Sequence, residues 1–152
     1  MLANYFEKKH FDYVLNKSLD DISLKFELLS SMLRLNILSA IQKAGSGHLG
    51  TSFSVVEIMI TSLIFLRKNF PNGHLFSSKG HDAPALYACY EALGMIRNKS
   101  LLNLRRVGGL PGHPDVETPN IEFNTGSLGM GISKANGWLS AGEYISEKKE
   151  II

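Results

Sequence analysis

The sequence predicts an α/β layered fold that is rich in helices and has a parallel sheet. Long segments carry apolar residues every three or four positions, which is typical of amphipathic helices. Short apolar segments lie between these helices, and this alternation is typical of a parallel sheet covered by helices. The 14 glycines gather mainly at 45–50, 108–112 and 126–131, between the helical patterns. Because only two short strands and a terminal stump are predicted, we expect the fold to be incomplete at its C-terminal end.

Composition excludes several classes of protein. The 152 residues correspond to one domain or part of one. A net charge of +2 is too small for a dedicated nucleic-acid binder. The single cysteine, Cys89, excludes an internal disulfide and favours a reducing, cytoplasmic location. The N-terminus does not resemble a secretory signal. The most apolar stretch, Val55–Leu66, is shorter than the roughly 20 residues of a membrane span, so we expect a core helix and no membrane partner.

The first part of the chain divides into an arm and a long helix. Residues 1–22 are predicted to be an N-terminal arm, with Tyr5, Phe6, Phe11 and Tyr13 for packing, and residues 23–152 the domain itself. The helix is predicted over 23–43, with start signals at Asp20, Asp21 and Ser23 and a stop at Gly45. Its apolar face is predicted to consist of Leu24, Leu28, Met32, Leu35, Leu38 and Ile41.

A second helix is predicted to begin at Ser54. Ser54 and Glu57 have the spacing of a capping box, in which each side chain accepts a hydrogen bond from a free backbone N–H of the first turn. The helix is apolar nearly all round, so we expect it to lie between two other layers.

A strand at His74–Ser78 and a turn at Gly80 are predicted to lead into a third helix. Asp82 is its predicted cap, Pro84 lies in its first turn, and Gly94 ends it. A short helix is predicted over Ser100–Arg105.

The remaining chain is predicted to be mostly loop and then a last helix. A short strand is possible at Ile121–Phe123, and the helix is predicted over 130–147. Glycine inside a helix costs about 1 kcal/mol relative to alanine, so Gly131, Gly137 and Gly142 predict close packing against another backbone. Glu150–Ile152 has the composition of a strand that begins there.

The histidines are the first candidates for chemistry. Four of the five directly follow a glycine: His48, His74, His81 and His113. An imidazole on a glycine turn is displayed at a loop tip, where sites are commonly built, although polar surface residues are an equally good interpretation. Their spacing matches neither HxxxH nor a CxxC site, so no metal site is predicted.

Two glycine-rich segments remain. Gly45–Gly50 matches GxGxxG, but a long helix precedes it where a dinucleotide site needs a strand, so we interpret the match as accidental. Asn124–Gly131 follows a possible strand and opens a helix, where free N–H groups favour anions. A tight turn without a ligand explains that segment equally well.

Three segments in series resemble the N-terminal, thiamine-diphosphate-binding domain of transketolase. They are Ser46–Gly50 (SGHLG), Ser78–Tyr87 (SKGHDAPALY), and Pro111–Asp115 (PGHPD) followed by Thr125–Gly131 (TGSLGMG). The resemblance runs from about Ser23 to the end. The Lys-Gly-His and TGSLG variants are most similar to the N-terminal subunit of split transketolases.

The resemblance implies a transferase that moves a two-carbon ketol unit between sugar phosphates. It implies thiamine diphosphate and Mg²⁺ as cofactors. It implies catalytic roles for His48, His81 and His113, and cofactor contacts for His81, Gly126, Ser127 and Leu128. Imidazole suits these roles because it donates and accepts protons near neutral pH.

The resemblance also implies what this chain lacks. The family's metal-binding Gly-Asp-Gly segment and downstream asparagine are expected beyond Ile152, and the activating glutamate lies in a second domain. We therefore expect metal ligands outside this chain, a C-terminal transketolase subunit or domain as partner in a homo- or hetero-oligomer, and an inactive chain on its own. Leu49, Lys79 and Ser127 replace residues that are commoner in the family, but no histidine is lost.

Two alternatives remain. The chain is either part of such an enzyme or a non-catalytic fragment or interaction module that keeps the first half of the fold. The related enzymes that make deoxyxylulose phosphate share the fold, but the PGHP and TGSLG pair fits transketolase better.

Overall fold

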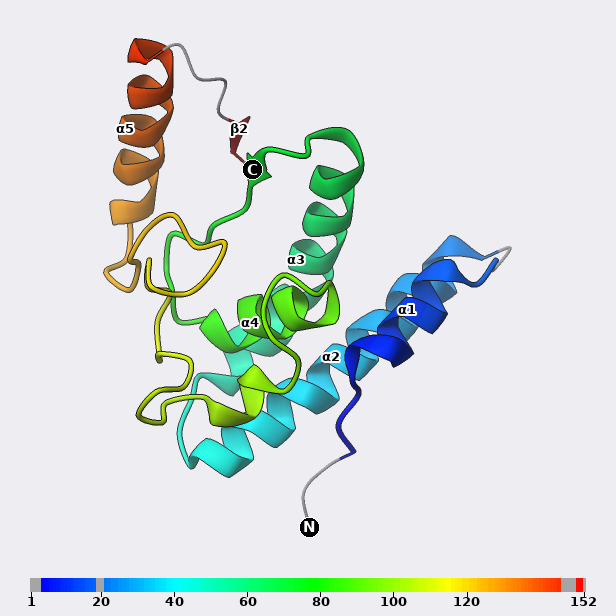
Figure 1. Cartoon of the computed structure of the whole chain (residues 1–152). Helices are drawn as coiled ribbons and strands as arrows, with labels where there is room; N and C mark the ends of the chain where they lie inside the picture. Colours follow the sequence, from blue (N-terminus) through cyan, green and yellow to red (C-terminus); the bar gives the residue numbers. More distant parts are fainter. Residues whose placement is uncertain (1–3, 19–20, 146–149, 152) are drawn as a thin grey trace.

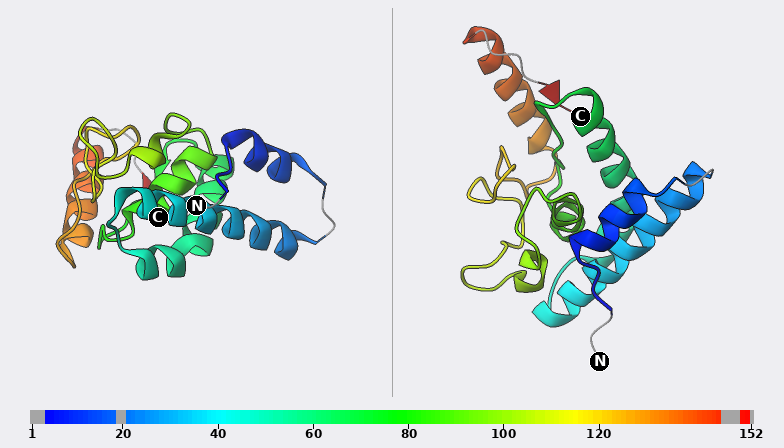
Figure 2. Two further views of the ribbon diagram at one scale, coloured as in Figure 1. Left: turned by 90° about the horizontal axis from the view of Figure 1, so that it is seen from below. Right: turned by 45° about the vertical axis from the view of Figure 1, so that its right-hand side comes forward.

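The computed structural model describes residues 4–18, 21–145 and 150–151. Figure 1 shows a body of packed helices, with the helix α5 (Met130–Tyr144) standing apart from it. The helix α1 (Lys8–Asn16) lies beside α2 (Ile22–Ala44), at the opposite side of the molecule from α5 in both views of Figure 2. The predicted helix-rich α/β fold is confirmed, with a very small sheet.

The helix α2 begins and ends at the predicted signals. The Asp21 carboxylate accepts hydrogen bonds from the backbone N–H groups of Ser23 (2.8 Å) and Leu24 (3.2 Å). Gly45 adopts a left-handed φ of 73° and donates to the carbonyl of Ile41, as is typical of a glycine that ends a helix. Asp20 lies outside the described residues.

The predicted core face of α2 is wrong at four of its six residues, whereas Met32 is buried and Ile41 is partly buried against the core. Leu24 is 52% exposed, and Leu28, Leu35 and Leu38 are also exposed. A neighbouring stripe, which shares Met32 with the predicted face, lies against the core, and it carries polar residues among the apolar ones: Leu29, Ser30, Met32, Leu33, Asn36, Ile37, Ser39 and Ala40. The helix therefore has two apolar stripes, and the periodicity that predicts a helix does not decide which of them meets α1, α3 and α4.

The helix α3 (Leu49–Asn69) begins before the predicted Ser54. The predicted capping box is wrong because Ser54 lies inside the helix and donates to the carbonyl of Thr51 at 3.1 Å. Glu57 forms an ion pair with Arg34 of α2 at 2.6 Å instead. That carboxylate thus has a tertiary partner in place of a local one.

Only one long face of α3 is covered. Val56, Met59, Ile60 and Leu63 lie in the core against α2 and α4, whereas Ile58 is 66% exposed. The expectation of layers on both sides is wrong for the described residues. Within those residues α3 is also the one helix long and apolar enough to span a membrane by length and composition. The same composition is expected of a helix whose inner face builds a core.

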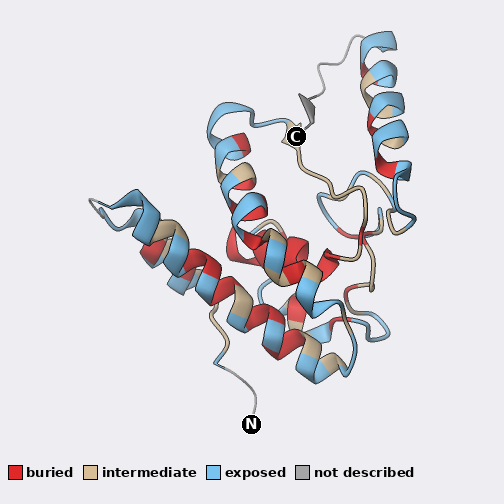
Figure 3. Cartoon of the chain, turned by 180° about the vertical axis from the view of Figure 1, so that it is seen from behind, coloured by how far each residue is buried: buried red, intermediate tan, exposed pale blue. Residues whose placement is uncertain are grey.

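The helix α4 (Ala83–Ala92) is the centre of the core, and each of its residues is buried, as Figure 3 shows in red. Its bounds agree with the prediction, and Gly94 follows it in a left-handed conformation. Asp82 does precede the helix, but its side chain does not cap it. The short predicted helix is a 3₁₀ turn, η1 (Ser100–Asn103), which ends before Arg105.

The sheet is parallel, as predicted, and consists of two very short strands. Strand β1 (Gly73–His74) pairs with β2 (Glu150–Ile151). Of the strand predicted at His74–Ser78, only His74 lies in a strand. The predicted strand at Ile121–Phe123 does not form, because the Ile121 N–H bonds locally to the Thr118 carbonyl at 3.2 Å. The predicted Ile152 of the terminal strand and the last helical turn to Glu147 lie outside the described residues.

The glycines of α5 differ in their surroundings. A Cβ on Gly131 would lie 2.5 Å from the Cα of Ser78, which confirms the predicted close backbone approach. A Cβ on Gly137 would meet nothing within 4 Å among the described residues, so the prediction is wrong there. Gly142 is buried.

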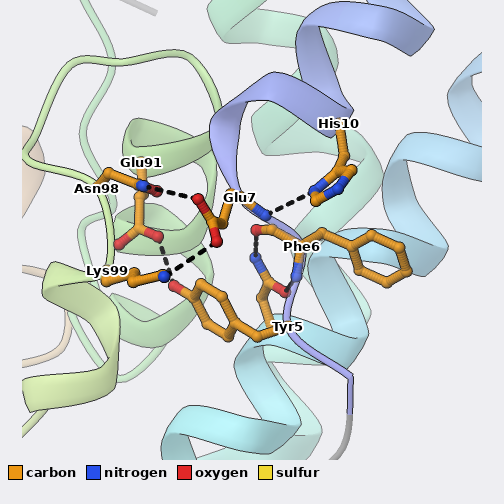
Figure 4. A network of polar contacts seen from close by, with 8 residues as sticks. Tyr5, Phe6, Glu7, His10, Glu91, Asn98 and Lys99 are labelled. Carbon is orange, nitrogen blue, oxygen red and sulfur yellow. Dashed lines mark hydrogen bonds and ion pairs between the residues drawn. The ribbon is translucent and has the colours of Figure 1, made fainter.

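The N-terminal segment is held to the core by buried polar side chains (Figure 4). The Asn36 side chain accepts from the N–H of Phe6 (2.7 Å) and donates to its carbonyl (2.8 Å). The Tyr5 hydroxyl donates to the buried Glu91 carboxylate, and Lys99 pairs with Glu7 at 2.9 Å. Phe11 is buried and Tyr5 and Phe6 are half-buried, whereas Tyr13 is exposed. The domain boundary after residue 22 stays a prediction.

Candidate functional site

Three of the glycine-linked histidines meet at one place. His48 immediately precedes α3, His81 lies in the turn before α4, and His113 lies in the long loop that follows η1. The ring centroids are 4.9 Å apart for His48 and His81, 5.1 Å for His81 and His113, and 6.2 Å for His48 and His113. One ring nitrogen from each lies within 4.8 Å of the others. The fourth, His74, contacts Glu122 (3.2 Å) and Trp138 instead.

Gly80 allows the His81 turn to lie against the loop that contains Thr125. Its φ is +66°, and a Cβ there would lie 2.7 Å from Thr125 Oγ1 and 2.8 Å from the backbone nitrogen of Gly126. Such distances exclude any larger residue without movement of the neighbouring backbone. Glycine is therefore required at position 80 by the contact between the two loops.

The His81 ring has a defined tautomer. Its Nδ1 lies 2.7 Å from the carbonyl oxygen of Lys79. A carbonyl oxygen only accepts hydrogen bonds, so the proton must be on Nδ1. In the neutral ring this leaves Nε2 with a lone pair, able to accept a proton or bind an electrophile.

His113 is positioned by Tyr87 and favours the neutral state. The Tyr87 hydroxyl donates to the backbone carbonyl of His113 at 3.0 Å. Burial lowers the pKa of His113, and the neighbouring His81, Arg105 and His48 lower it further, because a positive charge there is poorly solvated and repelled. More of this imidazole is therefore neutral at a given pH than of a free histidine.

Gly126 is the residue of the predicted cofactor segment Gly126–Leu128 that lies against a histidine of the cluster. A Cβ on Gly126 would lie 3.2 Å from Cδ2 of His113. Ser127 and Leu128 are exposed, with Leu128 at 72%. Hydrogen bonds from the Thr125 N–H to the Pro114 carbonyl (3.2 Å) and from Asn124 to Asp115 (3.0 Å) hold the two loops together.

Asp82 and Tyr87 are residues of this region to which the sequence assigned no site role. Asp82 is buried, accepts from the Ser77 hydroxyl at 2.9 Å and lies 3.4 Å from the Lys79 ammonium. It thus supports the turn that carries His81. From the sequence alone, an acid that is buried beside a glycine turn has the same pattern as an acid that caps a helix. Tyr87 follows Pro84 within the helix, and its spacing carries no signal for a contact with a distant loop.

The residues present fit part of the implied cofactor. Thr125 Oγ1 is buried and has no hydrogen-bond partner among the described residues, and it lies at the edge of the glycine-lined turn. A buried hydroxyl without a partner is unfavourable, so a ligand with polar groups would satisfy it. The histidine cluster does not fit Mg²⁺, which prefers oxygen ligands. We therefore still expect the ligands of Mg²⁺ to lie outside this chain.

Comparison with known proteins agrees with these features. A family model described as "Transketolase, thiamine diphosphate binding domain" matches residues 27–150. Transketolase from Homo sapiens is 34% identical over 128 residues, which cover 78% of this chain and 20% of that protein. Transketolase-like protein 2 from Bos taurus is 36% identical over 129 residues, with the same coverage.

A shorter relative matches as well. An apulose-4-phosphate transketolase subunit from Phocaeicola vulgatus is 33% identical over 123 residues, which cover 76% of this chain and 44% of that protein. The chain thus spans about a fifth of the length of the two former relatives. Because the family model matches most of the chain, the chain belongs to the transketolase thiamine diphosphate binding domain family.

Proposed function

We propose that this chain forms part of a transketolase-like enzyme that transfers a two-carbon ketol unit between sugar phosphates. The observation that carries the proposal is the meeting of three imidazoles beside Gly126, at the turn that opens α5. Sugar phosphates present many hydroxyl groups, and an imidazole in its neutral form can both donate to and accept from them.

Each histidine has a distinct role in this proposal. His48 is exposed and donates to or accepts from hydroxyl groups of the incoming sugar. His81, with its Nδ1 proton held by Lys79, accepts a proton at Nε2. His113, whose pKa is lowered, accepts hydrogen bonds as a neutral ring. General acid–base groups of this kind are worth roughly 10²–10⁴-fold in rate.

Thiamine diphosphate would lie at Gly126, Ser127 and Leu128 and against His81. When bound, this cofactor supplies the stabilised carbanion that protein side chains cannot provide. Gly126 carries no Cβ, and this keeps its backbone close to the His113 ring. Thr125 Oγ1 then gains a hydrogen-bond partner that the described residues do not supply.

A second subunit or domain is proposed to complete the enzyme in a homo- or hetero-oligomer. The relative from Phocaeicola vulgatus is named as one subunit of a transketolase. In this chain the stripe of α2 at Leu24, Leu28, Leu35 and Leu38 is exposed, as are Ile132, Tyr144 and Ile145 at α5. Apolar stripes of this kind favour burial against further polypeptide. We therefore expect the 152-residue chain to be inactive without this partner. We also propose that groups outside this chain hold Mg²⁺ and that the enzyme is cytoplasmic.

The same exposed stripes favour one alternative, a non-catalytic interaction module. Calorimetric titration of thiamine diphosphate with Mg²⁺ separates the two. It is run on the chain alone and on the chain mixed with a polypeptide that supplies the downstream region and second domain of a transketolase. The enzyme proposal expects binding in the mixture, lost in His81→Ala and Gly126→Ala and kept in His10→Gln, which alters an exposed histidine outside the cluster. A folded mixture that forms a complex but binds no cofactor would support the interaction module.

A further inference from the structure

The histidine cluster has the donor atoms of a transition-metal site, although the linear spacing of its members predicts none. Its three members come from three loops, and one nitrogen of each lies within 4.8 Å of the others. Zinc–nitrogen bonds are about 2.0–2.1 Å long, so nitrogens around a tetrahedral ion lie about 3.3 Å apart. Each pair of nitrogens must therefore close by at most about 1.5 Å. His48 is exposed, and we expect rotation of its side chain to supply part of this movement.

The His81 ring is already prepared as a metal ligand. Its Nδ1 proton bonds to the Lys79 carbonyl, which in the neutral ring leaves the lone pair on Nε2. Histidines that bind metals commonly donate their second ring N–H to a backbone carbonyl, which fixes the tautomer and the ring orientation.

His113 is likewise held in place without the use of its ring nitrogens. Tyr87 anchors its backbone carbonyl at 3.0 Å, and its ring lies against the space left by Gly126. Arg105 is a permanently charged neighbour that acts on this ring, beside His81 and His48. Its positive charge opposes a cation, so we expect moderate affinity and not the tight binding of a structural zinc site.

We propose that His48, His81 and His113 bind a transition-metal ion of the zinc class, with the fourth position left to water. Imidazole suits Zn²⁺, Co²⁺, Cu²⁺ and Ni²⁺, whereas Mg²⁺ prefers oxygen. The site is distinct in chemistry from the Mg²⁺ expected with thiamine diphosphate. If the proposed function holds, an ion here occupies the imidazoles that would contact the sugar, and zinc inhibits the enzyme.

The test uses the whole chain without any cofactor, so its outcome does not depend on the proposed function. Co²⁺ is titrated into the chain and followed by the visible absorption of the tetrahedral ion, and Zn²⁺ is then added as a competitor. We expect one equivalent of Co²⁺ to bind and Zn²⁺ to displace it, while Mg²⁺ in excess does not.

Variants decide whether the cluster is responsible. His48→Gln, His81→Gln and His113→Gln are each expected to weaken binding by about tenfold or more, because loss of an outer-shell partner alone costs that much and here a ligand is lost. His10→Gln and His74→Gln are the matched controls, since both change a histidine outside the cluster. Circular dichroism verifies that each variant is folded. His48 is exposed, so His48→Gln remains informative if the other two unfold. No Co²⁺ binding by the folded chain, or equal binding by all variants, would overturn the proposal.

Discussion

Replacement of Gly80 by alanine tests whether contact between loops holds the histidine site together. Gly80 has a φ of +66°, and an added Cβ would lie 2.7–2.9 Å from three atoms of Thr125 and Gly126. Two of these atoms are backbone, which cannot rotate away as a flexible side chain would. The substitution must therefore either strain the turn or move the loop that carries Gly126.

Gly45 is the matched control. It has a similar φ of +73°, but an added Cβ would meet nothing within 4 Å among the described residues. Gly45→Ala should cost only the left-handed backbone term, about 1–2 kcal/mol. Gly80→Ala carries the same term and an overpacking term of about 1–3 kcal/mol. We expect a total loss of roughly 2–5 kcal/mol for Gly80→Ala.

Urea unfolding followed by circular dichroism measures both variants. The free energies of unfolding of the two variants are compared after verifying that both have the same slope of free energy against urea concentration. An equal slope shows that both variants expose the same amount of surface on unfolding. Equal losses for Gly80→Ala and Gly45→Ala would refute the reasoning, because the loop contact would then contribute nothing. In the reconstituted enzyme, Gly80→Ala should also weaken cofactor binding, whereas Gly45→Ala should not.

Three further predictions follow from other parts of the structure. Asn36→Leu should lower the free energy of unfolding by about 1–3 kcal/mol because it leaves the backbone groups of Phe6 without their partners, while Asn98→Leu, at an exposed position, should have little effect in the same urea assay. Cys89 is 0% exposed and burial raises its pKa, so a thiol reagent should label it only after urea is added; rapid labelling of the native chain would contradict its burial. His113 should titrate by NMR below the value of about 6.5 for a free histidine, and His81→Gln should raise its pKa by removing a repulsive neighbour. Because the unfolded chain takes up this proton first, His113 should destabilise the fold as the pH falls below the unfolded pKa; an unshifted pKa would refute the described burial and repulsion.

The amino-acid sequence by itself determined the features that depend on a single turn of chain. Asp21 and Gly45 mark the two ends of α2 as predicted, and Pro84 and Gly94 mark those of α4. These signals are readable because capping and chain reversal involve neighbouring residues. The family resemblance also rested on short motifs and was confirmed by the match over residues 27–150. The roles of the histidines and of Gly126 stay predictions.

Only the tertiary structure decided which groups meet across the fold. Glu57 pairs with Arg34 of another helix, although this acid has the spacing of a helix cap. Local and distant partners compete for the same carboxylate, and sequence spacing measures only the local one. The buried stripe of α2 and the meeting of His48, His81 and His113 depend in the same way on how helices and loops pack. Periodicity predicts that a helix has an apolar face, but the surface against which the helix packs decides which face is buried. Loops that are distant in sequence form a site only when the core brings them together.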